Sequence, residues 1–126
     1  MKDKIYGFLI DEEVLLDITK RRMVRFTDVS SINSMTIRVV SLNVTLVRLL
    51  TLLLTNKNET IISKNDILFY VFGRDNPSSS SQRVWHAINE LKQKLSAIGL
   101  PDDFILNVRN SGYLINNHQI SVLFHG

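Results

Sequence analysis

The stretch 78-SSSSQRVWHAINELKQKLSAIGL-100 decides how the chain folds. Its apolar residues follow one another at steps of four, three, four and three positions, which is the spacing of one face of an α-helix. They are Val84, Ile88, Leu91, Leu95 and Ile98. The spacing predicts a helix over residues 79–98 whose apolar stripe packs against a core. Ser79 and Gln82 have the spacing of a capping box at its start, and Gly99 and Pro101 end it.

The side of this helix opposite the apolar stripe is polar. At about 100° per residue, it is lined by Gln82, His86, Asn89 and Gln93. The flanking positions are Trp85 and Lys92 on one edge and Arg83 and Lys94 on the other. Such a ridge is either a solvated helix face or a surface that reads DNA, because Asn and Gln amides can bond the major-groove edge of adenine. The surrounding elements must decide between these two interpretations.

Two further helices precede this one. Asn43 is a suitable N-cap, and the leucine-rich residues that follow it are apolar on almost every side, which is typical of a buried central helix. Ser63 can cap a shorter helix that stops at Gly73, and a polar loop with Pro77 comes next. The sequence therefore predicts three helices, over about 43–56, 64–72 and 79–98.

Short strands surround these helices. Residues 5–40 contain apolar or β-branched clusters between polar turns, which predicts an N-terminal antiparallel sheet with Lys20, Arg21 and Arg22 in one turn. Residues 104–115 predict a hairpin with an Asn-Ser-Gly turn, and the tail 119-QISVLF-124 either adds a strand or frays. Strands, three helices and a hairpin wing are the layout of an α+β winged helix-turn-helix. We expect one such domain over residues 1–126.

Composition narrows the class of protein further. A chain of 126 residues with 44% apolar residues can bury a proper core as one domain. It has no cysteine, which removes disulfides and thiolate chemistry and suits a reducing compartment. The net charge of +3 permits binding to nucleic acid but does not require it. The apolar run 44-VTLVRLLTLLL-54 is interrupted by Arg48 and is too short to span a membrane, so we expect a cytoplasmic protein.

Four stretches of the chain match, in order, the motifs of a known family. The stretches 41-SLNVTLVRLL-50 and 61-IISKNDILFYVFG-73 are similar to its Leu-Thr-x-x-Glu-x-x-Leu-Leu and Val-Ser-Arg…Leu…Val-Trp-Gly patterns. The stretches 84-VWHAINELKQKL-95 and 108-VRNSGYLI-115 are similar to Val-x-x-x-Ile-x-x-Leu-Arg-x-Lys-Leu and Val-Arg-Gly-x-Gly-Tyr-x-Leu. The chain thus resembles the OmpR/PhoB-type winged-helix domain, in particular ToxR/CadC-like bacterial transcription regulators. The resemblance implies binding to promoter DNA, commonly as tandem or paired copies, through the helix over 79–98 and the wing.

The resemblance also assigns individual positions. It places phosphate and base contacts on the helix at Gln82, Arg83, Asn89 and Lys92, and wing contacts at Arg109 and Tyr113. Arg109 stands where the family's wing arginine approaches the minor groove. Three departures from the family pattern weaken the expected binding to DNA. Glu90 and Leu114 stand where many relatives carry arginine, and Lys92 replaces an arginine. An acid repels phosphates, and lysine lacks the planar fork of arginine.

Further candidates come from the residues themselves. His86 belongs to the polar ridge, and Lys94 is expected to contact phosphate together with the basic residues above. Lys64 and Arg74, at the start of the second helix and in the loop after it, are weaker candidates. Trp85 is the only tryptophan, and we interpret it as a boundary packing residue because large aromatics are mostly buried. The alternative is a contact with a base or sugar.

We therefore expect a sequence-specific DNA-binding transcription regulator rather than an enzyme. Neither a Gly-rich phosphate loop, nor a Ser-His-Asp order, nor a metal-ligand spacing occurs in the sequence, so we expect no cofactor and no small-molecule substrate. The expected partners are double-stranded promoter DNA and, in addition, RNA polymerase or a partner regulator. The alternative is a winged-helix interaction module with weak DNA affinity that modulates such a partner through the sheet at 5–40 or the loop at 74–81.

Overall fold

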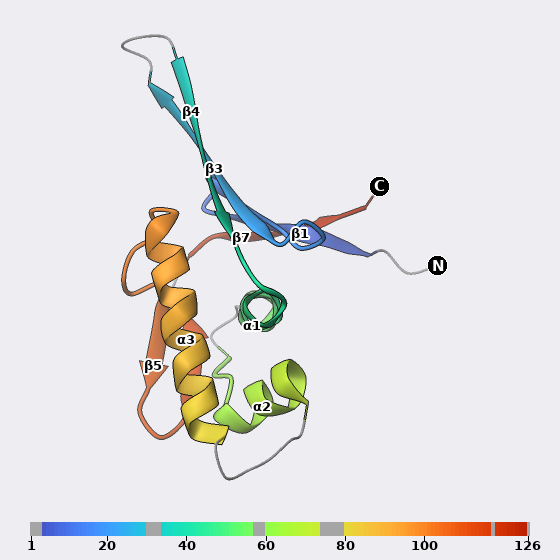
Figure 1. Ribbon diagram of the computed structural model, residues 1–126, viewed down its shortest axis with the longest axis vertical. Coiled ribbons are helices and arrows are strands. Elements are labelled where there is room, and N and C mark those ends of the chain that lie inside the picture. The colour runs from blue at the N-terminus through green and yellow to red at the C-terminus, as the bar shows by residue number, and fades with distance from the viewer. Residues whose placement is uncertain (1–3, 30–33, 57–59, 74–79, 117, 126) are drawn as a thin grey trace.

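The structure is a computed structural model that describes residues 4–29, 34–56, 60–73, 80–116 and 118–125. Four strands come first, followed by three helices and three more strands. Figure 1 shows them as a sheet, a group of helices below it and a hairpin beside the longest helix. The expected fold class, an α+β winged helix with an N-terminal antiparallel sheet, is confirmed.

A five-stranded sheet forms one end of the molecule (Figure 1). All of its strand pairs are antiparallel. The strands follow across it in the order β4 (Ser34–Ser41), β3 (Arg22–Val29), β2 (Val14–Asp17), β1 (Ile5–Ile10) and β7 (Ile120–Phe124). Because side chains alternate between the two faces of a strand, one face gathers apolar residues that are fully buried. They are Phe8, Ile10, Val14, Leu16 and Met23. The tail therefore adds a strand, since β7 pairs with β1.

The basic group after β2 is divided between a turn and a strand. Arg21 lies in the turn with a φ of 52°, and its amide donates to the carbonyl of Ile18 at 3.2 Å. The amide of Lys20 donates to the carboxylate of Asp17 at 3.1 Å. Arg22 pairs with Asp17 as the first residue of β3. The expectation that all three basic residues lie in the turn is therefore wrong for Arg22, because the strand ladder already includes it.

Side-chain caps mark the starts of α1 and α2. Asn43 caps α1 (Val44–Thr55) by accepting from the amide of Leu46 at 2.8 Å. Ser63 caps α2 (Lys64–Phe72) by accepting from the amide of Asp66 at 3.0 Å. These bonds satisfy donors that a helix start leaves free, and both predicted caps are confirmed. The described part of the third helix, α3, is Ser80–Ala97. Ser79, the predicted cap, lies outside the described residues.

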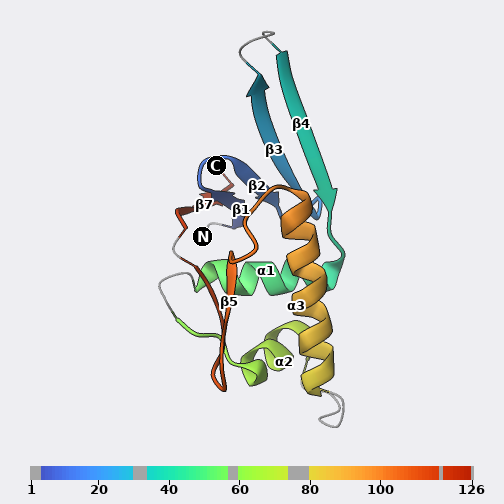
Figure 2. The same cartoon turned by 90° about the vertical axis from the view of Figure 1, so that its left-hand side faces the viewer.

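The core lies around α1, which Figures 1 and 2 place between the sheet and α2. Its leucines are buried on several sides, as expected of a central helix: Leu46, Leu49, Leu50, Leu53 and Leu54 are each at most 1% exposed. The predicted apolar stripe of α3 is buried as well, and its five members are at most 2% exposed. The stripe therefore does face the core.

The wing is the hairpin of β5 (Ile105–Val108) and β6 (Gly112–Ile115). Its turn comprises residues 109–111, because Gly112 already pairs with Val108 and the amide of Ser111 donates to the carbonyl of Val108 at 2.9 Å. Asn110 adopts a φ of 64° there. The wing is tied to the segment before α2, since Ile62 and Tyr113 exchange two backbone hydrogen bonds of 2.7 and 2.9 Å. The hairpin is thus held in a defined position beside the helices.

Candidate nucleic-acid interface

Most of the polar face of α3 is exposed. Gln82, His86 and Gln93 are exposed, and Asn89 is half-buried. The amide nitrogen of Asn89 donates to the main-chain oxygen of Trp85 at 2.8 Å, one turn earlier in the helix. This bond uses one of the two amide hydrogens, so the oxygen and the second hydrogen stay available. Three of the four residues of the predicted ridge are therefore exposed, and the fourth, Asn89, is partly covered.

The two edges of this face lie against different elements. The guanidinium of Arg83 lies 4.6 Å from the centre of the Phe72 ring at the end of α2. A cation over an aromatic face is a favourable contact, and Arg83 is half-buried by its surroundings. Lys92 lines a hollow with Asp102, Phe104 and Ile105, where the chain enters the wing. Arg83 thus marks the side of α3 that faces α2, and Lys92 marks the side that faces the wing.

The exposure of Trp85 contradicts the prediction that it is a packing residue. Its side chain is 56% exposed. Its ring contacts His86 edge to face, with ring centroids 5.1 Å apart. The apolar stripe of α3 fills the core without it, which leaves the indole at the surface. The prediction of a mostly buried tryptophan was therefore wrong.

Of the two wing residues that were expected to contact DNA, one lies at the surface. Arg109 is exposed in the wing turn. The tip of the wing and the N-terminal end of α3 lie at the same end of the molecule, away from the sheet, in both views (Figures 1 and 2). Tyr113 instead belongs to the core at 3% exposure, and burial raises the pKa of its phenol. A ring in that position supports the wing from inside, so it does not form part of the exposed surface.

The remaining candidates are more scattered. Lys94 is half-buried on α3, and Lys64 is exposed as the first residue of α2. Glu90, the acidic departure from the family pattern, is exposed on α3. Arg74 lies outside the described residues. The exposed face of α3 and the wing tip therefore form the main surface on which the candidates converge.

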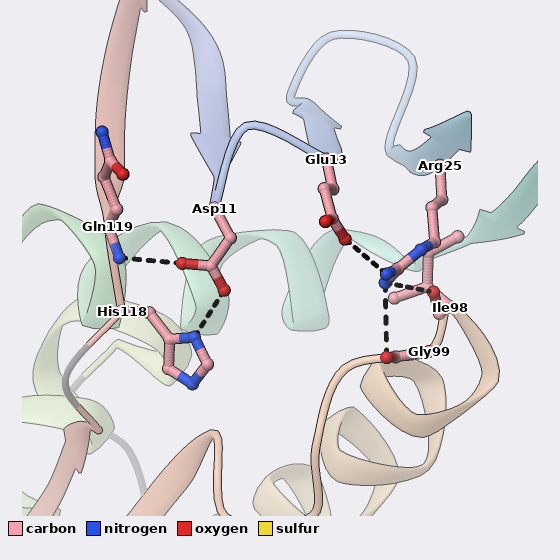
Figure 3. Close-up of polar contacts among 7 residues, drawn as sticks. All are labelled: Asp11, Glu13, Arg25, Ile98, Gly99, His118 and Gln119. Carbon is pink, nitrogen blue, oxygen red and sulfur yellow. Dashed lines mark hydrogen bonds and ion pairs between the residues drawn. The ribbon is translucent and has the colours of Figure 1, made fainter. Parts of the chain in front are cut away.

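Sequence reasoning missed the anchor at the other end of α3. Figure 3 shows the guanidinium of Arg25, from β3, donating to the main-chain oxygens of Ile98 and Gly99 at 3.3 Å each. It also forms an ion pair with Glu13. Arg38 in β4, the cross-strand partner of Arg25, donates to the oxygen of Ala97 at 3.4 Å. Free carbonyls and the negative end of the helix dipole favour cations at a helix C-terminus. The available signal was an arginine two residues after Met23, on the same face of the strand as that fully buried side chain.

A second polar cluster joins the first turn of the sheet to the last strand (Figure 3). The Nδ1 atom of His118 lies 2.6 Å from one carboxylate oxygen of Asp11, and the amide of Gln119 donates to the other at 2.9 Å. The amide of Asp11 in turn donates to the carbonyl of Gln119 at 2.7 Å. These bonds fix the start of β7 against β1. The cluster has a structural role, because both of its ends belong to the scaffold.

Among the residues that the structure describes, no group of three or more His, Cys, Asp or Glu side chains is placed to hold a metal ion. Over the same part of the chain, no helix has the length and apolar character needed to cross a membrane.

Comparisons with known proteins agree with this fold. A family model described as "Transcriptional regulatory protein, C terminal" matches residues 38–115. The DNA-binding domain of E. coli CadC has a TM-score of 0.69 at 17% identity, covering 96% of this chain and 99% of that one. The DNA-binding domain of the response regulator AdeR, in complex with an intercistronic region, has a TM-score of 0.64 at 13% identity, covering 83% and 95%. A search of curated proteins found no match.

The sheet, the three helices and the wing define a winged-helix domain of the kind found in transcription regulators. The family model covers more than half of the chain. The chain therefore belongs to the family of C-terminal domains of transcriptional regulatory proteins, the OmpR/PhoB-type winged-helix domains.

Proposed function

We propose that this chain is a sequence-specific DNA-binding transcription regulator that docks α3 in the major groove and the wing on the adjacent minor groove. The observation that carries the proposal is the position of the wing tip, which lies at the same end of the molecule as the exposed N-terminal half of α3 (Figures 1 and 2). A major groove about 12 Å wide admits one helix. A wing at the same end of that helix can reach the neighbouring stretch of the duplex.

Recognition of bases falls to the polar face of α3. Gln82 and His86, which are exposed, and Asn89, which is half-buried, present donors and acceptors from successive turns of one face of α3. Base edges in the major groove carry a distinct pattern of donors and acceptors for each base pair, and amide side chains match that of adenine. We therefore expect A·T pairs in the preferred site. Arg25 holds the C-terminal end of α3 by bonding the carbonyls of Ile98 and Gly99. The N-terminal half of α3 therefore stays free to enter the groove.

Contacts with phosphates fall to the basic residues at the edges of this surface. Arg83 and Lys92 flank α3 on the α2 side and the wing side, and Arg109 stands at the wing tip. Lys94 and Lys64 add charge farther along. Each phosphate that is neutralised releases counterions and makes binding more sensitive to salt. Glu90 on the same helix opposes this attraction, so we expect a modest affinity for random DNA.

The decisive experiment measures binding by fluorescence anisotropy across a salt series. The two probes are a random duplex and the region upstream of the chain's own gene. We expect tighter binding to the upstream region and affinity that falls steeply as salt rises on both probes. Weak binding to both duplexes at low salt, without dependence on salt, would contradict the proposal.

A further inference from the structure

We infer that Trp85 determines part of the sequence specificity by contacting the methyl group of a thymine in the major groove. The inference rests on the proposed function and names one chemical feature of the DNA that α3 reads. It assigns to the indole the role of an apolar contact within a surface that otherwise offers hydrogen bonds.

Trp85 leaves more than half of its side chain exposed in the free chain. Its neighbour Val84 and the next stripe residue, Ile88, are at most 2% exposed, whereas Trp85 is 56% exposed. Its ring contacts that of His86, which is itself exposed. Among the described residues of α3, no other large apolar side chain is exposed to this degree. An indole left in water retains apolar surface that a ligand can cover.

The position of Trp85 joins it to the base-reading face. Residues three and four apart are neighbours on a helix surface, so Trp85 lies beside both Gln82 and Asn89. The amide of Asn89 bonds the main-chain oxygen of Trp85. Lys92, on the same edge, lines the hollow where the chain enters the wing. The indole therefore lies on the same edge of α3 as Lys92, next to the amides that would read bases.

The major groove contains one apolar group that matches this side chain. Thymine carries a C5 methyl there, whereas the other groups that base pairs present in the groove are hydrogen-bond donors and acceptors. An apolar side chain on a recognition helix gains free energy by covering that methyl. The methyl also marks A·T pairs, which the neighbouring amides of Gln82 and Asn89 are suited to read. One surface would then recognise both members of such a pair.

The test removes the methyl and nothing else. The full chain first selects its preferred duplexes from a random library, and each thymine of a selected duplex is then replaced in turn by deoxyuridine. The wild-type chain should bind about threefold to fivefold less tightly when the contacted thymine is replaced, as expected for one buried methyl. Trp85→Ala should bind the two duplexes equally. Phe69→Ala, at a side chain of α2 that is 55% exposed, is the matched control and should keep the preference.

A second measurement needs no substitution. Trp85 is the only tryptophan of the chain, so its fluorescence reports this site directly even if Trp85→Ala fails to fold. Its emission should move to shorter wavelength when saturating duplex removes the indole from water. Unchanged emission, a Trp85→Ala variant that keeps the wild-type preference for thymine, or a wild type indifferent to every replacement would overturn the inference while leaving DNA binding intact. Failure to select any duplex above random would overturn the proposed function as well.

Discussion

The guanidinium of Arg25 bonds the carbonyl of Gly99, 74 residues farther along the chain, at 3.3 Å. The same group bonds Ile98 and pairs with Glu13. One side chain of β3 thus connects the sheet to the C-terminal end of α3 (Figure 3). The proposed DNA contacts lie on the N-terminal half of the same helix. The sheet positions α3, and its own residues need not touch DNA to influence binding.

Replacing Arg25 should loosen this anchor. Arg25→Ala removes the bonds to two carbonyls and the partner of Glu13, so we expect the free energy of unfolding to fall by about 1–2 kcal/mol. DNA affinity should fall too, but the dependence of affinity on salt should stay the same, because Arg25 contacts no phosphate in the proposed complex. Urea unfolding and a salt series measure the two effects. A reduced salt slope would instead assign Arg25 to the DNA surface.

Arg109 should contribute directly to the salt dependence. Arg109→Ala should weaken binding and lower the slope of log affinity against log salt by about 0.9, the amount expected for one phosphate. Arg48→Ala, at an exposed arginine of α1 that lines a hollow together with Tyr70, is the matched control and should leave the slope unchanged. Equal slopes for wild type and Arg109→Ala would exclude a phosphate contact at the wing tip.

Asn89 should matter for one sequence more than for others. Asn89→Ala should cost about 1–3 kcal/mol of binding free energy on the selected site and little on random duplex, because reading a base edge benefits only the correct base. Anisotropy titrations on both duplexes give the difference. Equal losses on the two probes would show that Asn89 does not read sequence.

Gly112 should be required for the wing. A Cβ atom at this position would lie 2.1 Å from the carbonyl oxygen of Ile62, and its φ of 147° is one that other residues rarely adopt. We expect Gly112→Ala to lower the free energy of unfolding by about 2–3 kcal/mol. Gly73→Ala is the comparison, since among the described residues nothing lies within 4 Å of its added Cβ; its φ of 70° and ψ of 157° carry a backbone cost without that clash, so its loss should be the smaller of the two. Similar losses in the two variants would disprove the steric argument.

Tyr113 should make the fold sensitive to alkaline pH. Burial raises the pKa of this phenol above the ordinary value of 10.0, so the folded chain keeps the proton after the unfolded chain has lost it. Its contribution to stability is therefore complete below that value and decreases as pH rises above it. Tyr113→Phe should make the alkaline decline in unfolding free energy less steep and leave the slope below about pH 9 unchanged. An identical alkaline slope in both chains would argue against a buried phenol.

Interactions between near neighbours were predictable from the sequence. The caps at Asn43 and Ser63 depend on side chains that reach an amide three residues away, and the stripe of α3 depends on helix periodicity alone. The wing and the sheet followed from alternating patterns and turn residues. The exposed ridge of α3 was also predictable, because what remains opposite a buried stripe must face outward.

Trp85 and Tyr113 were misassigned because their burial depends on residues distant in sequence. Tyr113 is covered because β6 bonds Ile62, and Trp85 is exposed because the stripe already fills the space against α1. The anchor at Arg25 joins residues more than 70 positions apart. Periodicity and capping are local and can be read from one segment, so the sequence by itself determined the helices, the wing and the class of fold. Which side chains of those elements reach the surface depends on how distant segments pack, and only the tertiary structure decided that.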